Sequence, residues 1–204
     1  DYLQTVGYGM GEHRLPNSEA DIRWQVSFGM AFGASGFECF TYNSVKSAAD
    51  GWTSAMITSG GKITPLYTYC KTVFSEVRAW EEVYLSFKYD GTMVSISDYV
   101  GSQSHEELEN LSYKLDGHER IKNISTTRDT LIGTFKDANG YDGFSFCTYN
   151  DPYYQKYNVI DVTFNDATGA LVYHNGVKEV IELQNGKFNR EIAAGDTLFV
   201  IPTK

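Results

Sequence analysis

The sequence is short of positive charge, of cysteine and of long hydrophobic runs. Its 17 basic side chains are outnumbered by 26 acidic ones, which gives a formal charge of -9. Lys and Arg are scattered and form no run, so the chain lacks the clustered cations that bind nucleic-acid phosphates. We therefore expect no nucleic-acid partner.

The absence of an apolar stretch of about 18 residues means that no membrane-spanning helix and no membrane partner are predicted. The first residues lack the basic, then apolar, then small-residue order of a secretory signal. The 3 cysteines are an odd number in apolar surroundings, which suits reduced thiols and favours a cytoplasmic location over a secreted one. Because the chain starts without Met, we expect it to be part of a longer protein.

Aromatic residues, by contrast, are abundant: 15 Tyr, 12 Phe and 3 Trp. A disordered chain has far fewer, and 204 residues can bury most of their unfolded surface, so one or two folded domains are predicted. Near residues 86–91 helical periods give way to short alternating runs broken by glycine-containing turns. This change divides the chain into residues 1–88 and residues 89–204.

Residues 1–88 have the pattern strand, helix, strand, helix. Residues 2–6 form a short strand-like run, and a helix capped by Asn17 or Ser18 follows it. Residues 36–42 are apolar and too short for a helix, which predicts a buried strand. Thr64 and Pro65 then begin a second helix of about 20 residues. Buried strands that are each followed by a covering helix indicate parallel pairing.

Residues 89–204 are predicted to form an antiparallel β-sandwich. Strands recur at roughly 8–12-residue spacing, which is typical of such folds. The Asn-Gly pairs at residues 175–176 and 185–186 favour the type I′ turns of hairpins. The polar residues 102–122 are expected to form a surface insertion with one helical turn. The strands are expected near residues 93–97, 130–136, 144–149, 159–165, 171–174, 177–183, 187–192 and 197–201.

Residues 21–42 (DIRWQVSFGMAFGASGFECFTY) combine a helix, a Gly-Ala-x-Gly turn and a strand with Phe-x-Tyr. This pattern resembles the last two βα units of TIM-barrel glycosidases, especially the bacterial beta-galactosidase-like glycoside hydrolases akin to family 42. The strand at residues 2–5 with Arg14-Leu15-Pro16 resembles their seventh strand and its loop, and the helix after Thr64-Pro65 resembles helix eight. Residues 89–204 are similar to the sandwich that follows the barrel, including the closing AGDTLF.

The resemblance covers nearly the whole chain and implies an α/β plus all-β fold. Residues 1–88 would be the last two βα units of a TIM barrel, and residues 89–204 an antiparallel β-sandwich accessory domain. A complete barrel has eight strands and about 250 residues, so most of it is missing. We therefore expect this chain to be a C-terminal fragment of a glycoside hydrolase that acts on O-glycosidic bonds.

The resemblance also implies retaining hydrolysis by two carboxylates about 5–5.5 Å apart. In the resembled enzymes the acid/base lies at the end of strand four, which is absent here. The nucleophile would come from strand seven, where this chain has Gln4 and no carboxylate. No catalytic residue is assigned, and the fragment alone is expected to be inactive.

Four residues at or near the strand ends are candidates for substrate binding: Gln4, Glu38, Tyr42 and Trp52. Gln4 is placed either to hydrogen-bond a sugar hydroxyl or to satisfy neighbouring strands. Glu38, in a strand predicted to be buried, requires a partner or a polar cavity, so it contacts either substrate or an interior base. Tyr42 and Trp52 are suited to stack on a pyranose ring, while the other reading of Trp52 is a plug between barrel and helices.

A rival interpretation is a noncatalytic carbohydrate-binding or scaffolding module that uses the tyrosines of residues 153–157. Coplanar exposed rings of Trp52, Tyr153 and Tyr154 would favour that module, and burial at the seam between the halves would favour the fragment. The expected partners are a carbohydrate and whatever covers the exposed sheet edges: the missing N-terminal part of the barrel, another chain, or a second copy in a homo-oligomer. No cofactor is expected, and no His, Cys and Asp spacing predicts a metal site.

Overall fold

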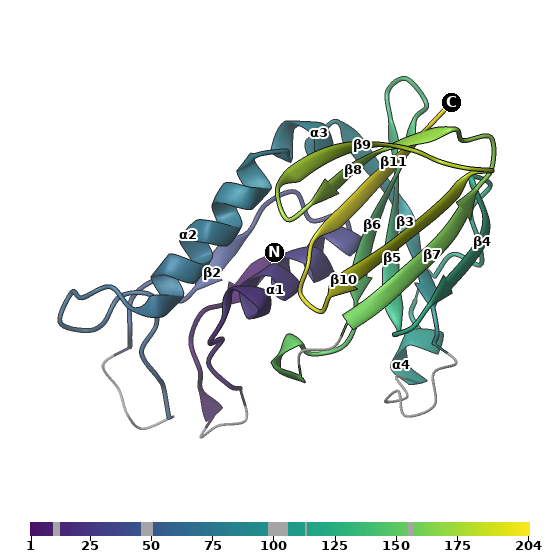
Figure 1. Ribbon diagram of the computed structural model, residues 1–204. Helices are drawn as coiled ribbons and strands as arrows, with labels where there is room; N and C mark the ends of the chain where they lie inside the picture. Colours follow the sequence, from purple (N-terminus) through teal and green to yellow (C-terminus); the bar gives the residue numbers. More distant parts are fainter. Residues whose placement is uncertain (10–12, 46–50, 98–105, 113, 155–156) are drawn as a thin grey trace.

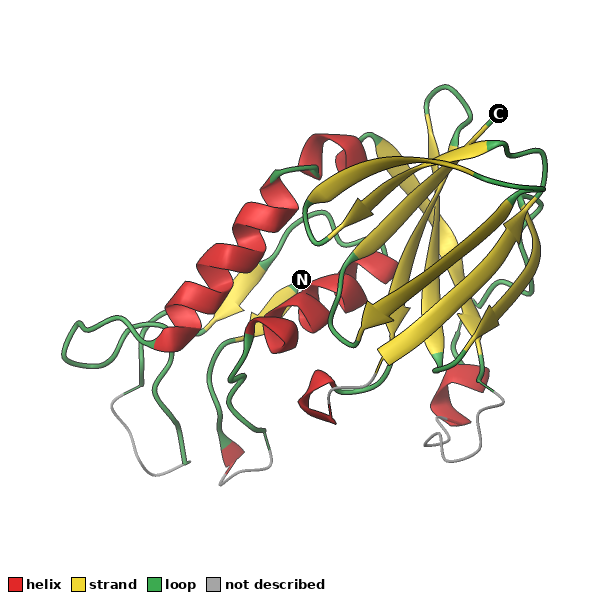
Figure 2. Cartoon of the chain, viewed as in Figure 1, coloured by secondary structure: helices red, strands yellow, loops and turns green. Residues whose placement is uncertain are grey.

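The computed structural model describes residues 1–9, 13–45, 51–97, 106–112, 114–154 and 157–204. The helices α1, α2 and α3 and a small parallel sheet lie to one side of two antiparallel sheets, and α4 lies below those sheets (Figures 1 and 2). The elements are β1 Tyr2–Gln4, α1 Glu19–Ala31, β2 Glu38–Phe40, α2 Pro65–Arg78, α3 Glu81–Leu85, β3 Phe87–Ser95, α4 Glu106–Glu109, β4 Ile121–Thr126, β5 Thr130–Asp137, β6 Asp142–Thr148, η2 Pro152–Tyr154, β7 Tyr157–Phe164, β8 Gly169–His174, β9 Val177–Glu182, β10 Lys187–Ala193 and β11 Leu198–Thr203.

The antiparallel part of the predicted fold class is confirmed. One sheet has the strand order β3-β5-β6-β11-β8-β9 and the other has the order β10-β7-β4. The two sheets face each other across an apolar core to which Phe144 and Val200 of the first sheet and Phe164 and Phe188 of the second contribute. The chain is therefore a mixed helix and sheet protein rich in antiparallel strands. The assignment of residues 1–88 to a barrel stays a prediction.

The central strands β5, β6 and β11 of the six-stranded sheet are buried on both faces. Every residue of β6 is buried, so the alternation expected of a half-exposed strand is absent. The reason is that α1 packs on the face away from the three-stranded sheet, closely enough that a Cβ on Gly133 would lie 2.6 Å from the Ala31 carbonyl oxygen. Thr92 Oγ1 donates to that same oxygen at 2.8 Å. A second core joins the helices to this face.

That second core contains Trp80 and Tyr84 from the helical segment together with Phe135, Tyr173 and Phe199 from the sheet. The Trp80 ring stacks on the Tyr173 ring with centroids 5.6 Å apart, and its centroid lies 5.7 Å from that of Phe199. Large aromatic rings bury much apolar area at such contacts. Residues 1–88 therefore pack directly on the sandwich, and β3 starts at Phe87, inside the predicted boundary region.

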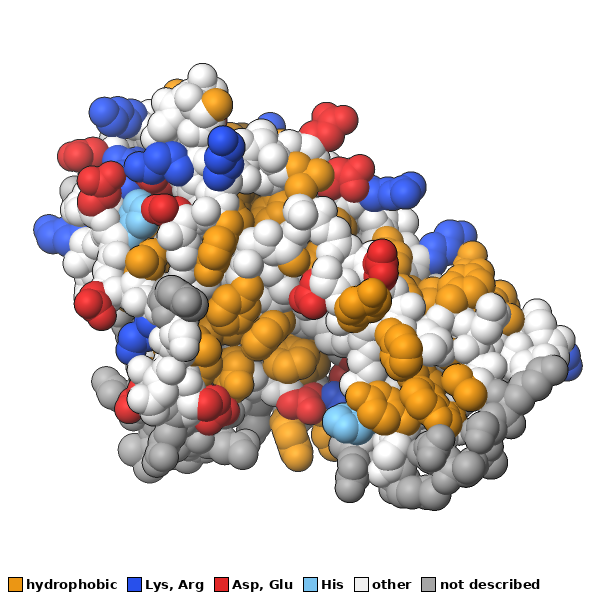
Figure 3. All heavy atoms as spheres, turned by 180° about the vertical axis from the view of Figure 1, so that it is seen from behind, with side chains coloured by type: hydrophobic (Ala, Val, Ile, Leu, Met, Phe, Trp, Pro, Cys, Tyr) orange, Lys and Arg blue, Asp and Glu red, His pale blue; other side chains and the backbone are white. Residues whose placement is uncertain are grey.

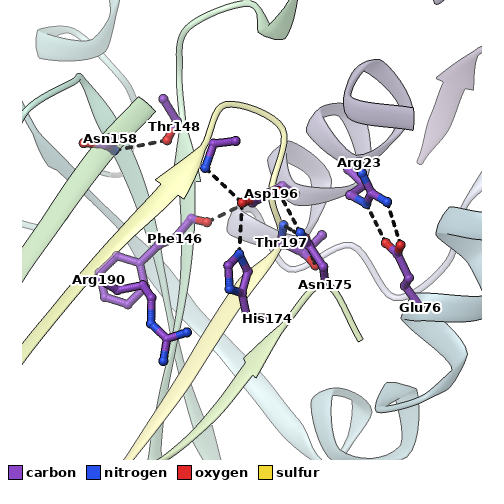
Figure 4. A network of polar contacts seen from close by, with 12 residues as sticks. Arg23, Glu76, Phe146, Thr148, Asn158, His174, Asn175, Arg190, Asp196 and Thr197 are labelled. Atoms are coloured by element: carbon purple, nitrogen blue, oxygen red, sulfur yellow. Dashed lines mark hydrogen bonds and ion pairs between the residues drawn. The ribbon is translucent and has the colours of Figure 1, made fainter. Parts of the chain in front are cut away.

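Two turns of the sandwich lie against the helices and are bonded to each other: the turn between β8 and β9 and the turn between β10 and β11 (Figure 4). Asp196, in the turn between β10 and β11, lies 2.9 Å from His174 Nε2, accepts from Asn175 Nδ2 at 2.7 Å and accepts from the Ala193 N–H. A Cβ on the adjacent Gly195 would come within 2.4 Å of the Ala20 carbonyl oxygen of α1. This turn therefore needs glycine and fixes α1 against the sheets.

Local signals in the sequence predicted several element ends correctly. Ser18 caps α1 in a capping box with Asp21, and Pro65 occupies the first turn of α2. Asn175 and Gly176 have φ angles of 46° and 81°, as a type I′ turn requires. Asn185 and Gly186 also have positive φ, but they lead from β9 in one sheet to β10 in the other and so do not close a hairpin within a sheet.

Three predictions about elements are wrong. The second helix is shorter than about 20 residues, because the backbone leaves the helix after Arg78 and brings Trp80 into the core before α3 begins. The polar insertion at residues 102–122 contains the predicted helical turn, α4, but its end belongs to β4, whose Ile124 packs on the sandwich core. Residues 102–105 and 113 of that insertion lie outside the described residues. The strand at residues 36–42 is short and half exposed.

Candidate functional site

The parallel strands β1 and β2 form the framework of the candidate site. Their register pairs Leu3 with Cys39 and Gln4 with Phe40. Leu3 is 1% exposed and packs with Cys39 against the helices, whereas Phe40 on the other face is 46% exposed. Because side chains alternate along a strand, Gln4, Glu38 and Phe40 share this second face, which we call the open face.

The loops that follow the two strands are joined at the carboxyl ends of the strands. The Gly7 N–H donates to Thr53 Oγ1 at 2.8 Å, and the Thr53 N–H donates to the Gly7 carbonyl oxygen at 2.9 Å. A Cβ on Gly7 would lie 2.9 Å from the Leu15 nitrogen, so only glycine allows this close approach. The two loops therefore present their side chains on one surface.

An aromatic cluster occupies that surface. Tyr8 stacks on His13 with ring centroids 4.2 Å apart and on Trp52 with centroids 5.2 Å apart. The ring of Trp52 also lies beside that of Phe40, with centroids 6.1 Å apart. These four residues, named here the strand-end aromatic cluster, join the end of β2 to both loops. In the rear view of Figure 3, hydrophobic side chains are exposed over this half of the molecule.

Gln4 supports the loop after β1. Its Nε2 donates to the carbonyl oxygens of Val6 and Arg14, each at 2.8 Å. Its backbone N–H donates to Gln25 Oε1, and Gln25 Nε2 donates back to the Gln4 carbonyl oxygen. Gln25 thus covers this part of the β1 edge. Both amide hydrogens of Gln4 are therefore used within the chain, which agrees with the interpretation that its side chain satisfies neighbouring backbone groups.

Glu38 is exposed, and the expectation that it is a buried carboxylate is wrong. Phe40 on the same face is 46% exposed, so this face of β2 is accessible to water. The argument that Glu38 requires a buried partner therefore falls away. Glu38 instead lies on the open face beside Gln4 and Phe40, where it is available to a ligand.

Tyr42 and Trp52 take different positions. Trp52 is half-buried in the strand-end aromatic cluster. Tyr42 is half exposed and lines a groove of about 650 Å³ on the opposite side of β2, between that strand and the helices α2 and α3. The structure therefore brings Gln4, Glu38 and Trp52 to the open face and its rim, and it places Tyr42 at the groove.

Arg14 connects this surface to the sandwich, a contact between distant parts of the chain that no local pattern predicts. Its guanidinium donates at 2.6 Å to both Asp21 of α1 and Asp151, which precedes η2, and lies 5.2 Å from the centre of the Tyr153 ring. Burial opposes the charge of Asp21, but hydrogen bonds from Arg14, Asn17 and Ser18 lower its pKa below the ordinary value. The hydrogen bond with Asp21 in turn raises the pKa of Arg14, so both groups stay charged.

The exposed tyrosines of the rival interpretation are neither coplanar nor buried at the seam. Tyr153 and Tyr154 are 59% and 65% exposed, and their rings meet edge to face at 89°. Such an arrangement makes no flat platform. Among the described residues no three His, Cys, Asp or Glu side chains gather as a metal site would require, and none of the described helices is long and apolar enough to cross a membrane.

No protein-family model, no curated protein and no solved structure matches this chain. Tyr8, His13 and Arg14 stand in or beside the glycine-rich stretch after β1. Tyr8 was not predicted as a site residue, and His13 and Arg14 were placed in the loop on the catalytic side but interpreted as solvated surface. The repeated glycines after the predicted strand are the sequence signal for this loop, because glycine allows the backbone to approach neighbouring groups closely.

Proposed function

We propose that the chain is the C-terminal part of a glycoside hydrolase, with residues 1–88 supplying the last two βα units of its barrel. The observation that supports this most is the arrangement of β1, α1, β2 and α2: parallel strands with helices on one face and an open face on the other. In a complete barrel the helices lie outside and the opposite faces of the strands point inward. The open face with Gln4 and Glu38 is then barrel interior.

The strand-end aromatic cluster fits the active-site end of such a barrel. Active sites of these folds lie at the carboxyl ends of the strands, where this cluster is found. Trp52 and Tyr8 offer ring faces to the C–H groups of a sugar, and Glu38 offers carboxylate oxygens to its hydroxyls, while Gln4 holds the loop after β1 in place. Retaining hydrolysis needs two carboxylates about 5–5.5 Å apart, so catalysis requires residues that this chain does not supply.

The fragment proposal is tested by the association state of the chain. The open face exposes Phe40, and an uncovered sheet pair with apolar side chains favours association. We expect sedimentation analysis to show concentration-dependent self-association, which Phe40→Lys reduces by placing charge on the open face. Tyr141→Lys, on the distant β5–β6 turn and similarly exposed, is the matched control and should leave association unchanged. A monodisperse monomer over the whole concentration range would contradict the fragment proposal.

The second candidate is a noncatalytic carbohydrate-binding module that would use the exposed side chains of Tyr153 and Tyr154, although their rings meet edge to face and make no flat platform. Calorimetric titration with galactosides and plant oligosaccharides separates the two functions. The fragment is expected to show no saturable binding, because most of its site is missing. Saturable binding that is lost in Tyr154→Ala but kept in Tyr141→Ala would favour the module instead.

A further inference from the structure

Two of the three cysteines meet in the folded chain although they lie on different elements. Cys39 is the middle residue of β2 and is half-buried, and Cys70 is a buried residue of α2. Both side chains belong to the apolar cluster between the helices and the sheet, and each thiol shifts the pKa of the other. Cys147 is also buried but belongs to β6 and to a separate apolar cluster. The chain therefore contains a thiol pair and an isolated thiol.

The alternation of β2 brings the two thiols together. Cys39 points with Leu3 toward the helices, and α2 turns its apolar side, with Leu66, Cys70 and Val73 buried, toward the same space. Both thiols also line the groove of about 650 Å³ between β2 and the helices α2 and α3. A small molecule in the groove thus has a route to the half-buried Cys39 sulfur.

We propose that Cys39 and Cys70 are a redox-active dithiol, which a low-molecular-weight disulfide entering the groove oxidises to an intramolecular disulfide linking β2 to α2. This site is separate from the open face and the strand-end aromatic cluster, which lie on the other side of β2. It also does not depend on whether the chain binds or hydrolyses a sugar.

The reaction is an ordinary thiol–disulfide exchange in two steps. The Cys39 thiolate attacks one sulfur of oxidised glutathione, which forms a mixed disulfide and releases one glutathione thiolate. Cys70 then loses its proton, and its thiolate attacks the Cys39 sulfur and releases the second glutathione. The two protein thiols are oxidised, one glutathione disulfide is reduced to two thiols, and the two protons leave with them.

The environment of the pair assigns the roles in this exchange. The neighbouring Cys70 thiol lowers the pKa of Cys39, which favours the thiolate that attacks first. The neighbouring Cys39 thiol, together with burial, raises the pKa of Cys70, so Cys70 keeps its proton until the mixed disulfide has formed. Burial raises the pKa of Cys147 to about 12, which keeps that thiol unreactive.

The test incubates the folded chain with excess oxidised glutathione and then counts free thiols with Ellman's reagent in denaturant. We expect the count to fall from three to one, and we expect peptide mapping to recover a Cys39–Cys70 crosslink. Cys147→Ala is the matched control: it should still form the crosslink and should end with no free thiol. Cys70→Ser should stop at the mixed disulfide and carry one glutathione on Cys39.

Circular dichroism of each variant before oxidation establishes that it is folded. Retention of all three thiols by the wild-type chain would overturn the proposal. Disulfide-linked dimers in place of the internal crosslink, or glutathione on Cys147 in preference to Cys39, would overturn it as well.

Discussion

Replacement of Trp80 by Ala tests whether the helical segment and the sandwich share one core. Trp80 is 2% exposed and contacts Tyr84 on its own segment and Tyr173 and Phe199 on the sheet. Truncation of a buried Trp or Phe to Ala costs about 3–5 kcal/mol, since apolar burial is lost and a cavity remains. For a chain of this size each kcal/mol lowers Tm by roughly 2–4 °C. We therefore expect Trp80→Ala to lower Tm by about 6–20 °C.

Trp80→Phe separates the ring packing from the indole nitrogen. Trp80 Nε1 is buried and has no hydrogen-bond partner among the described residues. An unsatisfied buried donor costs about 1–3 kcal/mol, so its removal offsets part of the lost ring area. We expect Trp80→Phe to cost less than about 1.5 kcal/mol, well below the Ala variant. Tyr154→Ala, at an exposed site, should stay within about 0.5 kcal/mol of wild type.

The assay is urea unfolding followed by far-ultraviolet circular dichroism and by tryptophan fluorescence. A shared core predicts that both signals move together to lower urea in Trp80→Ala. The reasoning is refuted if Trp80→Ala costs less than about 1 kcal/mol. It is also refuted if the fluorescence transition shifts alone while the sheet signal keeps its wild-type midpoint.

Two further predictions concern the turn between β10 and β11. Burial raises the pKa of Asp196, but hydrogen bonds from His174, Asn175 and the backbone outweigh it and hold that pKa below its ordinary value. The ionised carboxylate therefore stabilises the fold above the unfolded-state pKa, and this stability is lost as pH falls through the folded-state pKa. Acid titration of Tm should show a shallower decline in Asp196→Asn, and an unchanged decline would contradict this. Gly195→Ala should cost about 1–3 kcal/mol more than Gly140→Ala, since both have positive φ but only Gly195 meets α1, at the Ala20 carbonyl. The urea concentrations at the unfolding midpoints of the two variants measure the difference. Equal midpoints would show that the contact with α1 does not contribute to stability.

The features predicted correctly from sequence are those set by neighbouring residues. Ser18 caps α1 because its hydroxyl reaches the Asp21 N–H three positions later. Asn175 and Gly176 turn the chain because both tolerate positive φ. The antiparallel strands followed from alternation and turn spacing. The predicted positions of these elements needed no knowledge of distant contacts.

The candidate site was predicted only in part. Gln4, Glu38 and Trp52 were named from their places at the strand ends, and the structure puts them on or beside the open face. The exposure of Glu38 was missed, because an apolar run does not reveal whether anything covers it. The Tyr8 and His13 partners of Trp52 were missed because a stretch of chain that includes β2 separates the two loops.

The sequence by itself determined the order of most elements, though not strand β4 or the break between α2 and α3, together with the main caps and turns and the antiparallel character of residues 89–204. These properties depend on backbone preferences and on side-chain periodicity over a few residues. Only the tertiary structure decided that Trp80 packs on Tyr173, that Arg14 reaches Asp151, and that Cys39 and Cys70 line one groove. Each of these pairs joins elements far apart in the chain. Their contact depends on how helices and sheets pack, which no local pattern specifies.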